Sequence, residues 1–239
     1  MRFPRQLTEG HLVRRYKRFL ADVAFSGAAA RSAVSVETVH CANPGAMTGL
    51  AEPGMRVFLS RSANLRRKLP WSWEVVEAGA ALVGINTATP NRLAAEAILA
   101  GVIPELASYD VIRPEVPYGT RSRVDFVLSA PGRPDAYVEV KNAHLSRSPG
   151  LAEFPDSVTA RGARHLAELA KVVRSGRRAV MLYIVQRNDA DRFALARDLD
   201  PAYAAAFDRA RDCGVEMLAY ACRVSRREIV VKRPIPVLG

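Results

Sequence analysis

The sequence predicts an α/β protein built from a small all-β domain, residues 1–84, followed by an α/β domain with a mixed sheet, residues 85–239. Its 239 residues fall between the usual lengths of one and two domains. Hydrophobic residues make up 49% of the chain, enough for a core and too many for a disordered or fibrous protein. Near residue 85 the pattern changes from short β segments to long segments with helical periodicity.

The first domain contains short segments rich in β-branched and aromatic residues. The predicted strands lie within 12–25, 34–40, 56–60 and 73–77, with turns at 27–30, 43–45 and 52–54. Several short strands in fewer than 90 residues are typical of the five-stranded oligonucleotide/oligosaccharide-binding (OB) barrel. A small sandwich fits the pattern nearly as well.

The second domain contains helix start and stop signals. Thr89 and Pro90 predict a helix that ends at Gly101, and Asp200 and Pro201 predict one that ends at Gly214. A third helix is expected over 157–176, where apolar residues recur at helical spacing. The expected strands are 124–128, 137–141, 179–186 and 215–222. This order of helices and strands predicts a mixed sheet.

The chain is strongly basic, with 35 Lys and Arg against 24 Asp and Glu, a net charge of +11. Both halves contribute, so we expect a polyanionic partner. The longest apolar run, 179–185, is too short to span a membrane, and no signal peptide is visible. Three scattered cysteines predict neither a disulfide framework nor a zinc ribbon. We therefore expect a cytoplasmic protein without a membrane partner.

Two stretches of the first domain mix cations with aromatic rings, as nucleic-acid-binding surfaces do. The predicted contact residues are Arg14, Arg15, Lys17, Arg18, Arg66, Arg67 and Lys68. We expect DNA as the partner, with single-stranded DNA or RNA as alternatives and low sequence selectivity. Trp71 and Trp73 are interpreted either as stacking platforms or as core residues.

The most informative pattern is Asp125, followed after thirteen residues by Glu139 and then by Lys141. If Asp125 pairs with Glu139 across a hairpin, all three side chains share one face and the apolar neighbours share the other. Two carboxylates suit Mg²⁺ or Mn²⁺, and a metal-bound water with a nearby ammonium suits phosphodiester hydrolysis. The alternative is a solvent-facing hairpin that binds no metal.

Four further residues are expected to converge on this pocket. Glu96 is predicted as a third metal ligand, because a carboxylate on a mostly apolar helix face needs a partner. Gln186 ends a buried strand, where sites of α/β proteins gather. Arg161 and His165 are neighbours four residues apart in the helix after the hairpin, where phosphate could bind.

The helix Glu and the Asp-x13-Glu-x-Lys pattern resemble the PD-(D/E)XK nuclease superfamily, with Val124 in place of its usual proline. The whole chain further resembles the sugar fermentation stimulation protein (SfsA) family. The matching motifs span 12–22, 40–50, 67–71, 86–93, 122–126, 138–142, 154–156 and 161–166.

This resemblance implies an OB-like domain followed by a PD-(D/E)XK nuclease-like domain. It also implies DNA binding and a link to the regulation of sugar metabolism, particularly of maltose. Asp125, Glu139 and Lys141 then match the nuclease motif, with Glu96 as the helix carboxylate. Two hypotheses stay open, a divalent-metal-dependent nuclease and a DNA-binding regulator with a vestigial nuclease site.

Overall fold

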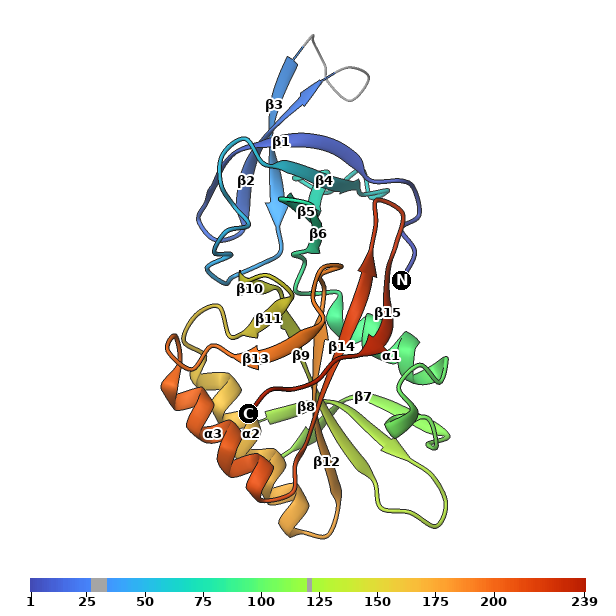
Figure 1. The fold of residues 1–239 in the computed structure, drawn as a ribbon. Coiled ribbons are helices and arrows are strands. Elements are labelled where there is room, and N and C mark those ends of the chain that lie inside the picture. The colour runs from blue at the N-terminus through green and yellow to red at the C-terminus, as the bar shows by residue number, and fades with distance from the viewer. Residues whose placement is uncertain (27–33, 120–121) are drawn as a thin grey trace.

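The computed structural model describes residues 1–26, 34–119 and 122–239. It contains an N-terminal barrel and a C-terminal part built on a second sheet (Figure 1). The turn expected at 27–30 lies outside the described residues.

The N-terminal part is a closed barrel. Its strands are β1 (Thr8–Tyr16), β2 (Leu20–Ser26), β3 (Val34–Cys41), β4 (Arg56–Arg61), β5 (Trp71–Ala78) and β6 (Ala81–Gly84). They follow the order β3-β2-β1-β4-β5-β6, and β3 also pairs in parallel with β5, so β1 to β5 close on themselves. The OB-like barrel is thereby confirmed and the sandwich alternative excluded.

Both tryptophans belong to the interior of this barrel. Trp73 is fully buried and donates its indole N–H to the Val75 carbonyl, and Trp71 packs against Phe25. The interpretation of these rings as stacking platforms is therefore wrong. A barrel of this size needs large side chains to fill its centre.

The C-terminal part combines three α-helices with two sheets. Its elements are α1 (Pro90–Leu99), a short 3-10 helix η2 (Pro104–Leu106), β7 (Val111–Tyr118), β8 (Ser122–Ser129), β9 (Ala136–Ala143), β10 (Leu145–Ser148), β11 (Leu151–Phe154), α2 (Ala160–Arg174), β12 (Arg178–Val185), β13 (Arg192–Leu195), α3 (Pro201–Asp212), β14 (Glu216–Val224) and β15 (Ile229–Pro234). All three predicted helices are present.

The larger sheet has the order β15-β14-β12-β9-β8-β7 and is mixed, as predicted. β12 runs parallel to β9 and β14, and the outer pairs are antiparallel. Helices α2 and α3 pack on one face and α1 on the other (Figure 1). Both faces of the sheet are therefore buried, and β9 lies near its centre.

The β8–β9 hairpin has the predicted register, with Phe126 opposite Val138. However, Val124 packs in the core beneath α2 and α3, whereas Phe126 packs in the core beneath α1. The expectation that all apolar residues share one face is therefore wrong. The in–out alternation of β8 breaks at Asp125, and helices cover both faces of the sheet.

The helices begin at polar residues. The Asp200 carboxylate accepts from the Tyr203 amide and the Thr159 hydroxyl accepts from the Gly162 amide. Thr89 precedes Pro90 at the start of α1 but does not cap it with its side chain; its hydroxyl lies 3.0 Å from Gln186 Oε1.

The two parts are in close contact. The chain passes from β6 into α1 within a few residues. Near the N-terminus, Phe3 and Leu7 pack in the core beneath α1, and their amides donate to carbonyls of the β14–β15 turn. Across the described ranges, no helix is long and apolar enough to cross a membrane.

Candidate functional site

The predicted catalytic residues gather on the face of β9 that α2 covers. Glu139 is 2% exposed and Lys141 follows it on the same face. Lys141 Nζ lies 2.6 Å from Glu139 Oε1, and His165 Nδ1 of α2 contacts the same oxygen. The structure therefore brings Glu139, Lys141 and His165 together, as expected from the sequence.

The neighbours of His165 define its protonated nitrogen. Arg161 Nε donates to His165 Nε2 at 3.3 Å, so Nε2 is the acceptor and Nδ1 carries the hydrogen that faces Glu139. Arg161 thus acts on the cluster through His165.

Glu139 is held in its ionised form. Burial favours the protonated carboxyl, but the hydrogen bond from His165 and the charge of Lys141 outweigh it, so the pKa of Glu139 is lowered. The other oxygen, Oε2, is buried and has no hydrogen-bond partner among the residues that the structure describes. A buried, ionised oxygen without a donor is a suitable ligand for a cation.

Asp125 lies beside Glu139 on the neighbouring strand. Its Oδ2 accepts from the Val140 amide at 2.7 Å, and its Oδ1 accepts from the Asn91 side chain of α1 at 2.8 Å. Burial and the charge of Glu139 nevertheless raise the pKa of Asp125. A divalent cation between the two carboxylates would remove this repulsion, so the donor set fits a hard metal ion.

Glu96 does not join Asp125 and Glu139, so the expectation that it is a third metal ligand is wrong. Its side chain is 43% exposed and forms ion pairs with Arg92 and with the amino group of Met1. The helical pattern placed it on an apolar face, but the N-terminal segment folds back beside α1 and supplies a charged partner. Asn91, one turn earlier, is the α1 residue that reaches Asp125.

Gln186 supports the site indirectly. Its side-chain amide donates to Asn142 Oδ1 at 2.8 Å, and Asn142 Nδ2 lies 2.9 Å from His144 Nδ1. His144 Nε2 in turn lies 3.3 Å from Asp156 Oδ2, which also accepts from the Met47 amide of the barrel. A continuous series of polar contacts therefore links the end of β12 to the barrel.

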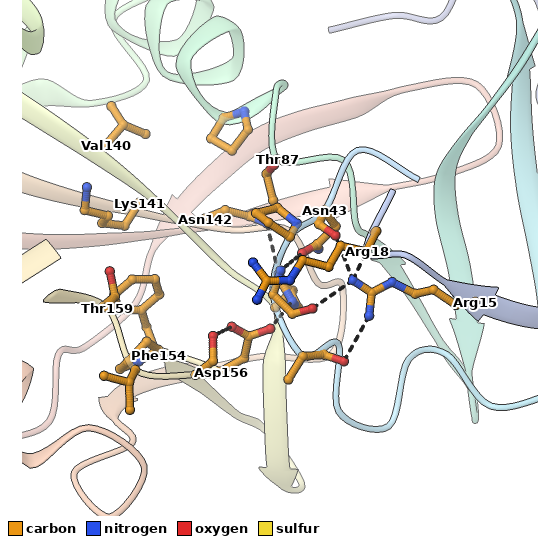
Figure 2. A pocket seen from close by; sticks show the side chains of 18 of the residues that line it. Arg15, Arg18, Asn43, Thr87, Val140, Lys141, Asn142, Phe154, Asp156 and Thr159 are labelled. Carbon is orange, nitrogen blue, oxygen red and sulfur yellow. Dashed lines mark hydrogen bonds and ion pairs between the residues drawn. The ribbon is translucent and has the colours of Figure 1, made fainter. Parts of the chain in front are cut away.

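Two clefts adjoin the cluster. The larger, about 840 Å³, is lined by both parts of the molecule and reaches Lys141 (Figure 2). We call it the interdomain cleft; its barrel side includes Arg15, Arg18 and residues 43–46. The smaller, about 620 Å³, is lined by Arg123, Arg161, Arg164 and His165 among others. The interdomain cleft therefore borders the cluster at Lys141, and the smaller cleft borders it at His165.

The predicted nucleic-acid contacts of β1 differ in what their side chains do. Arg14 forms an ion pair with Asp22. Arg15 donates to the carbonyls of Arg18, Asn43, Gly45 and Ala46, so its guanidinium is occupied in holding the loop. Arg15 is therefore a structural residue in this arrangement, a role that the charge pattern alone did not predict.

The other predicted basic residues are exposed. Lys17 and Arg18 form the tight turn between β1 and β2, with φ of 49° and 61°. Arg66, Arg67 and Lys68 lie in the β4–β5 loop, where Arg67 Nη2 is 3.3 Å from His40 Nδ1. Only Arg18 of these five lines the interdomain cleft.

Sequence reasoning missed Asn91, His144 and Asp156. Each is a single polar residue without a partner at a recognisable spacing, and each gains its place from contacts between distant segments. Within the described part of the chain, no group of three or more His, Cys, Asp or Glu side chains is arranged as a metal site.

Comparison with known proteins places the chain in a family. Residues 88–228 match the family model described as the sugar fermentation stimulation protein RE domain, and residues 13–85 match the SfsA N-terminal OB domain. The chain belongs to the SfsA family. Its relatives include the sugar fermentation stimulation protein homologs of Chelativorans sp. (56% identical, 98% of each chain) and Maricaulis maris (52% identical, 99% of this chain and 98% of the relative).

A solved structure shares the whole architecture. The SfsA protein of Pyrococcus furiosus, determined in complex with Ca²⁺, is 25% identical and superposes with a TM-score of 0.88. The match covers 100% of this chain and 98% of the other. The SfsA fold therefore extends from the barrel to the end of the mixed sheet.

Proposed function

We propose that this SfsA protein binds nucleic acid and hydrolyses phosphodiester bonds with the help of Mg²⁺ or Mn²⁺. The observation that carries the proposal is the cluster of Asp125, Glu139 and Lys141 beside a cleft that both domains line. The cluster combines the metal-binding carboxylates and the ammonium group that this chemistry requires.

Asp125 and Glu139 would hold the cation. Glu139 Oε2, which has no partner among the described residues, would bind the cation together with the neighbouring Asp125 carboxylate. The bound cation would lower the pKa of a water ligand and offset charge on the phosphate. Support comes from the P. furiosus relative, whose structure holds Ca²⁺, a divalent cation that also takes oxygen ligands.

The protein side chains would orient the carboxylates and offset the negative charge of the phosphate. The Lys141 side chain is 16% exposed and borders the interdomain cleft, so its ammonium group can donate to a phosphate oxygen or to the attacking water. His165 fixes the orientation of Glu139, and Asn91 fixes that of Asp125. Arg18, an exposed cation of the barrel that lines the cleft, would attract the polyanion.

A second candidate is a DNA-binding regulator, consistent with the role in sugar and maltose metabolism implied by the resemblance. The observation that favours it is the engagement of the carboxylates by protein donors. Both oxygens of Asp125 and one of Glu139 accept hydrogen bonds from the chain, and within the described residues Glu139 Oε2 alone of the four has no donor. Such a site can keep the arrangement of a nuclease site without cleaving nucleic acid.

Cleavage assays separate the two candidates. Labelled single- and double-stranded DNA and RNA are incubated with the protein in Mg²⁺, Mn²⁺ or EDTA. We expect metal-dependent cleavage that Glu139→Gln lowers by about 100-fold or more, because the variant loses the charge that holds the cation. Glu96→Gln is the matched control and should cleave at the wild-type rate, since Glu96 pairs with Arg92 and Met1 instead.

Cleavage that survives Glu139→Gln would show that another protein is responsible. Binding without cleavage of any of these substrates would favour the regulator. Absence of nucleic-acid binding at physiological salt would overturn both candidates.

A further inference from the structure

The interdomain cleft is bounded by the β1–β2 turn and the loop 43–46 on the barrel side and by Lys141 and residues 154–159 on the other. Figure 2 shows Arg18 reaching into this space from the barrel side, with Lys141 across from it. The cleft therefore runs from an exposed cation to the candidate catalytic cluster.

The polar groups of the cleft walls are already engaged. Asn43 is bonded to the Ile85 carbonyl and to the Gly45 amide. Asn142 is bonded to Gln186 and His144, and Asp156 accepts from the Met47 amide. These three side chains are therefore held by other protein groups and are not free to turn toward the edges of bases.

Arg18 is the principal free charge of the cleft. Its guanidinium has no hydrogen-bond or ion-pair partner within the described ranges, although its carbonyl accepts from Arg15. Polar and apolar groups line the rest of the cleft in similar measure, and the apolar part includes Pro44, Pro90, Val140, Phe154 and Pro155. A free cation beside this apolar part of the walls suits a phosphate joined to a planar base.

The size and the walls of the cleft discriminate between strand types. Its volume of about 840 Å³ lies within the range of small-ligand pockets, about 300–1,000 Å³, and fits a few nucleotides of one strand. A duplex encloses its bases and presents phosphates and sugars outward, so its bases cannot contact the apolar part of these walls. An unpaired strand exposes its bases to such walls.

We propose that the interdomain cleft binds an unpaired nucleic-acid strand without base selectivity, with Arg18 contacting a phosphate on the path to Lys141. This inference deepens the proposed function and rests on its nucleic-acid-binding part alone. It assigns the substrate class, single-stranded segments, and it assigns Arg18 a role that its neighbour Lys17 does not share.

The turn itself supplies a matched pair of variants. Lys17 and Arg18 are adjacent, exposed and cationic, and both have left-handed backbone angles, but Lys17 does not line the cleft. Asparagine tolerates this conformation, so Lys17→Asn and Arg18→Asn remove the same charge at similar conformational cost.

Binding is measured by fluorescence anisotropy in EDTA, which prevents metal-dependent cleavage. The probes are a labelled oligothymidylate, a duplex of the same length and free thymidine monophosphate, over a range of salt concentrations. We expect wild-type protein to prefer the single strand and Arg18→Asn to bind it about tenfold more weakly. The slope of log K against log salt should fall by about 0.7, the value for one phosphate contact on a single strand.

Lys17→Asn should stay within about twofold of the wild type at the same salt, since only long-range attraction is lost. The inference would be overturned if Lys17→Asn and Arg18→Asn lost affinity for the single strand equally. It would also be overturned if the wild type bound the duplex as tightly as the single strand. Tight binding of the free nucleotide with weak strand binding would replace it with a mononucleotide site.

The failures of the two proposals are distinguishable. Strand binding that depends on Arg18 but is never followed by cleavage removes the nuclease proposal and leaves this inference intact. Cleavage by the wild type together with equal strand binding by Lys17→Asn and Arg18→Asn removes this inference and leaves the nuclease proposal intact.

Discussion

Replacing Asp156 with asparagine is expected to lower the free energy of unfolding by about 2 kcal/mol at neutral pH. Asp156 joins the two domains: it accepts from the Met47 amide of the barrel at 3.1 Å and lies 3.3 Å from His144 Nε2. Burial would raise its pKa, but His144 and the Met47 amide more than offset this effect and bring the pKa down to about 2.

The magnitude follows from linkage between protonation and folding. The pKa falls from its ordinary 3.8 to about 2, and each pKa unit corresponds to about 1.4 kcal/mol. Because the folded-state pKa of Asp156 is depressed, its stabilisation is fully present above the unfolded pKa and is lost as the pH falls through the folded pKa. The difference between wild type and Asp156→Asn should therefore be full at pH 6 and about half as large at pH 3.

Urea denaturation at a series of pH values measures this difference. Asp198→Asn is the matched control, because the pKa of Asp198 is also about 2 but its side chain is exposed and paired with Arg147 in solvent. Solvent screening weakens such a pair, so this variant should unfold like the wild type. If Asp198→Asn proves as destabilising as Asp156→Asn, or if the loss is constant from pH 6 to pH 3, the reasoning from burial is refuted.

Three further predictions concern the site and its support. Asn91→Ala should weaken Mg²⁺ binding about tenfold in calorimetric titration, with little change in thermal stability, because Asp125 loses the donor that orients it. Unchanged affinity for Mg²⁺ would show that Asn91 does not support the site. Gly45→Ala should lower the free energy of unfolding by about 1–3 kcal/mol, since the new methyl carbon would lie 2.5 Å from Asp156 Oδ2, and a fully stable variant would contradict this close approach. Gln186→Leu should cost about 1–3 kcal/mol in urea denaturation because it leaves buried polar partners unsatisfied, and a neutral result would show that water replaces the amide.

Local patterns predicted much of this molecule. Helix-start residues predicted the positions of α1 and α3, and alternation along β9 placed Glu139 and Lys141 on the opposite face from Val138 and Val140. These features depend on neighbours close in sequence, so they can be read without the fold. The edge strands β7 and β15 and the short strands β10, β11 and β13 were missed. Most of β7 and the end of β15 are exposed, and four residues are too few for alternation to be recognised in β10, β11 or β13.

Contacts between distant segments determined which partners the charged side chains have, and local patterns could not predict those partners. Glu96 satisfied every local criterion for a buried carboxylate, yet the amino group of Met1 lies beside it. Arg15 and Arg18 are equivalent in a charge pattern. The Arg15 guanidinium binds carbonyls of the 43–46 loop, whereas that of Arg18 lines the cleft without a partner among the residues that the structure describes.

By itself, the sequence determined the two-domain α/β architecture, the basic charge and the Asp125, Glu139 and Lys141 motif, because periodicity, composition and spacing are properties of the linear chain. Only the tertiary structure decided which α1 residue reaches Asp125, which arginine lacks a partner in the described part of the chain, and that Lys141 borders a cleft shared by both domains. Those outcomes depend on where the barrel packs against the sheet, and that packing arises from the sum of many weak contacts between residues far apart in sequence.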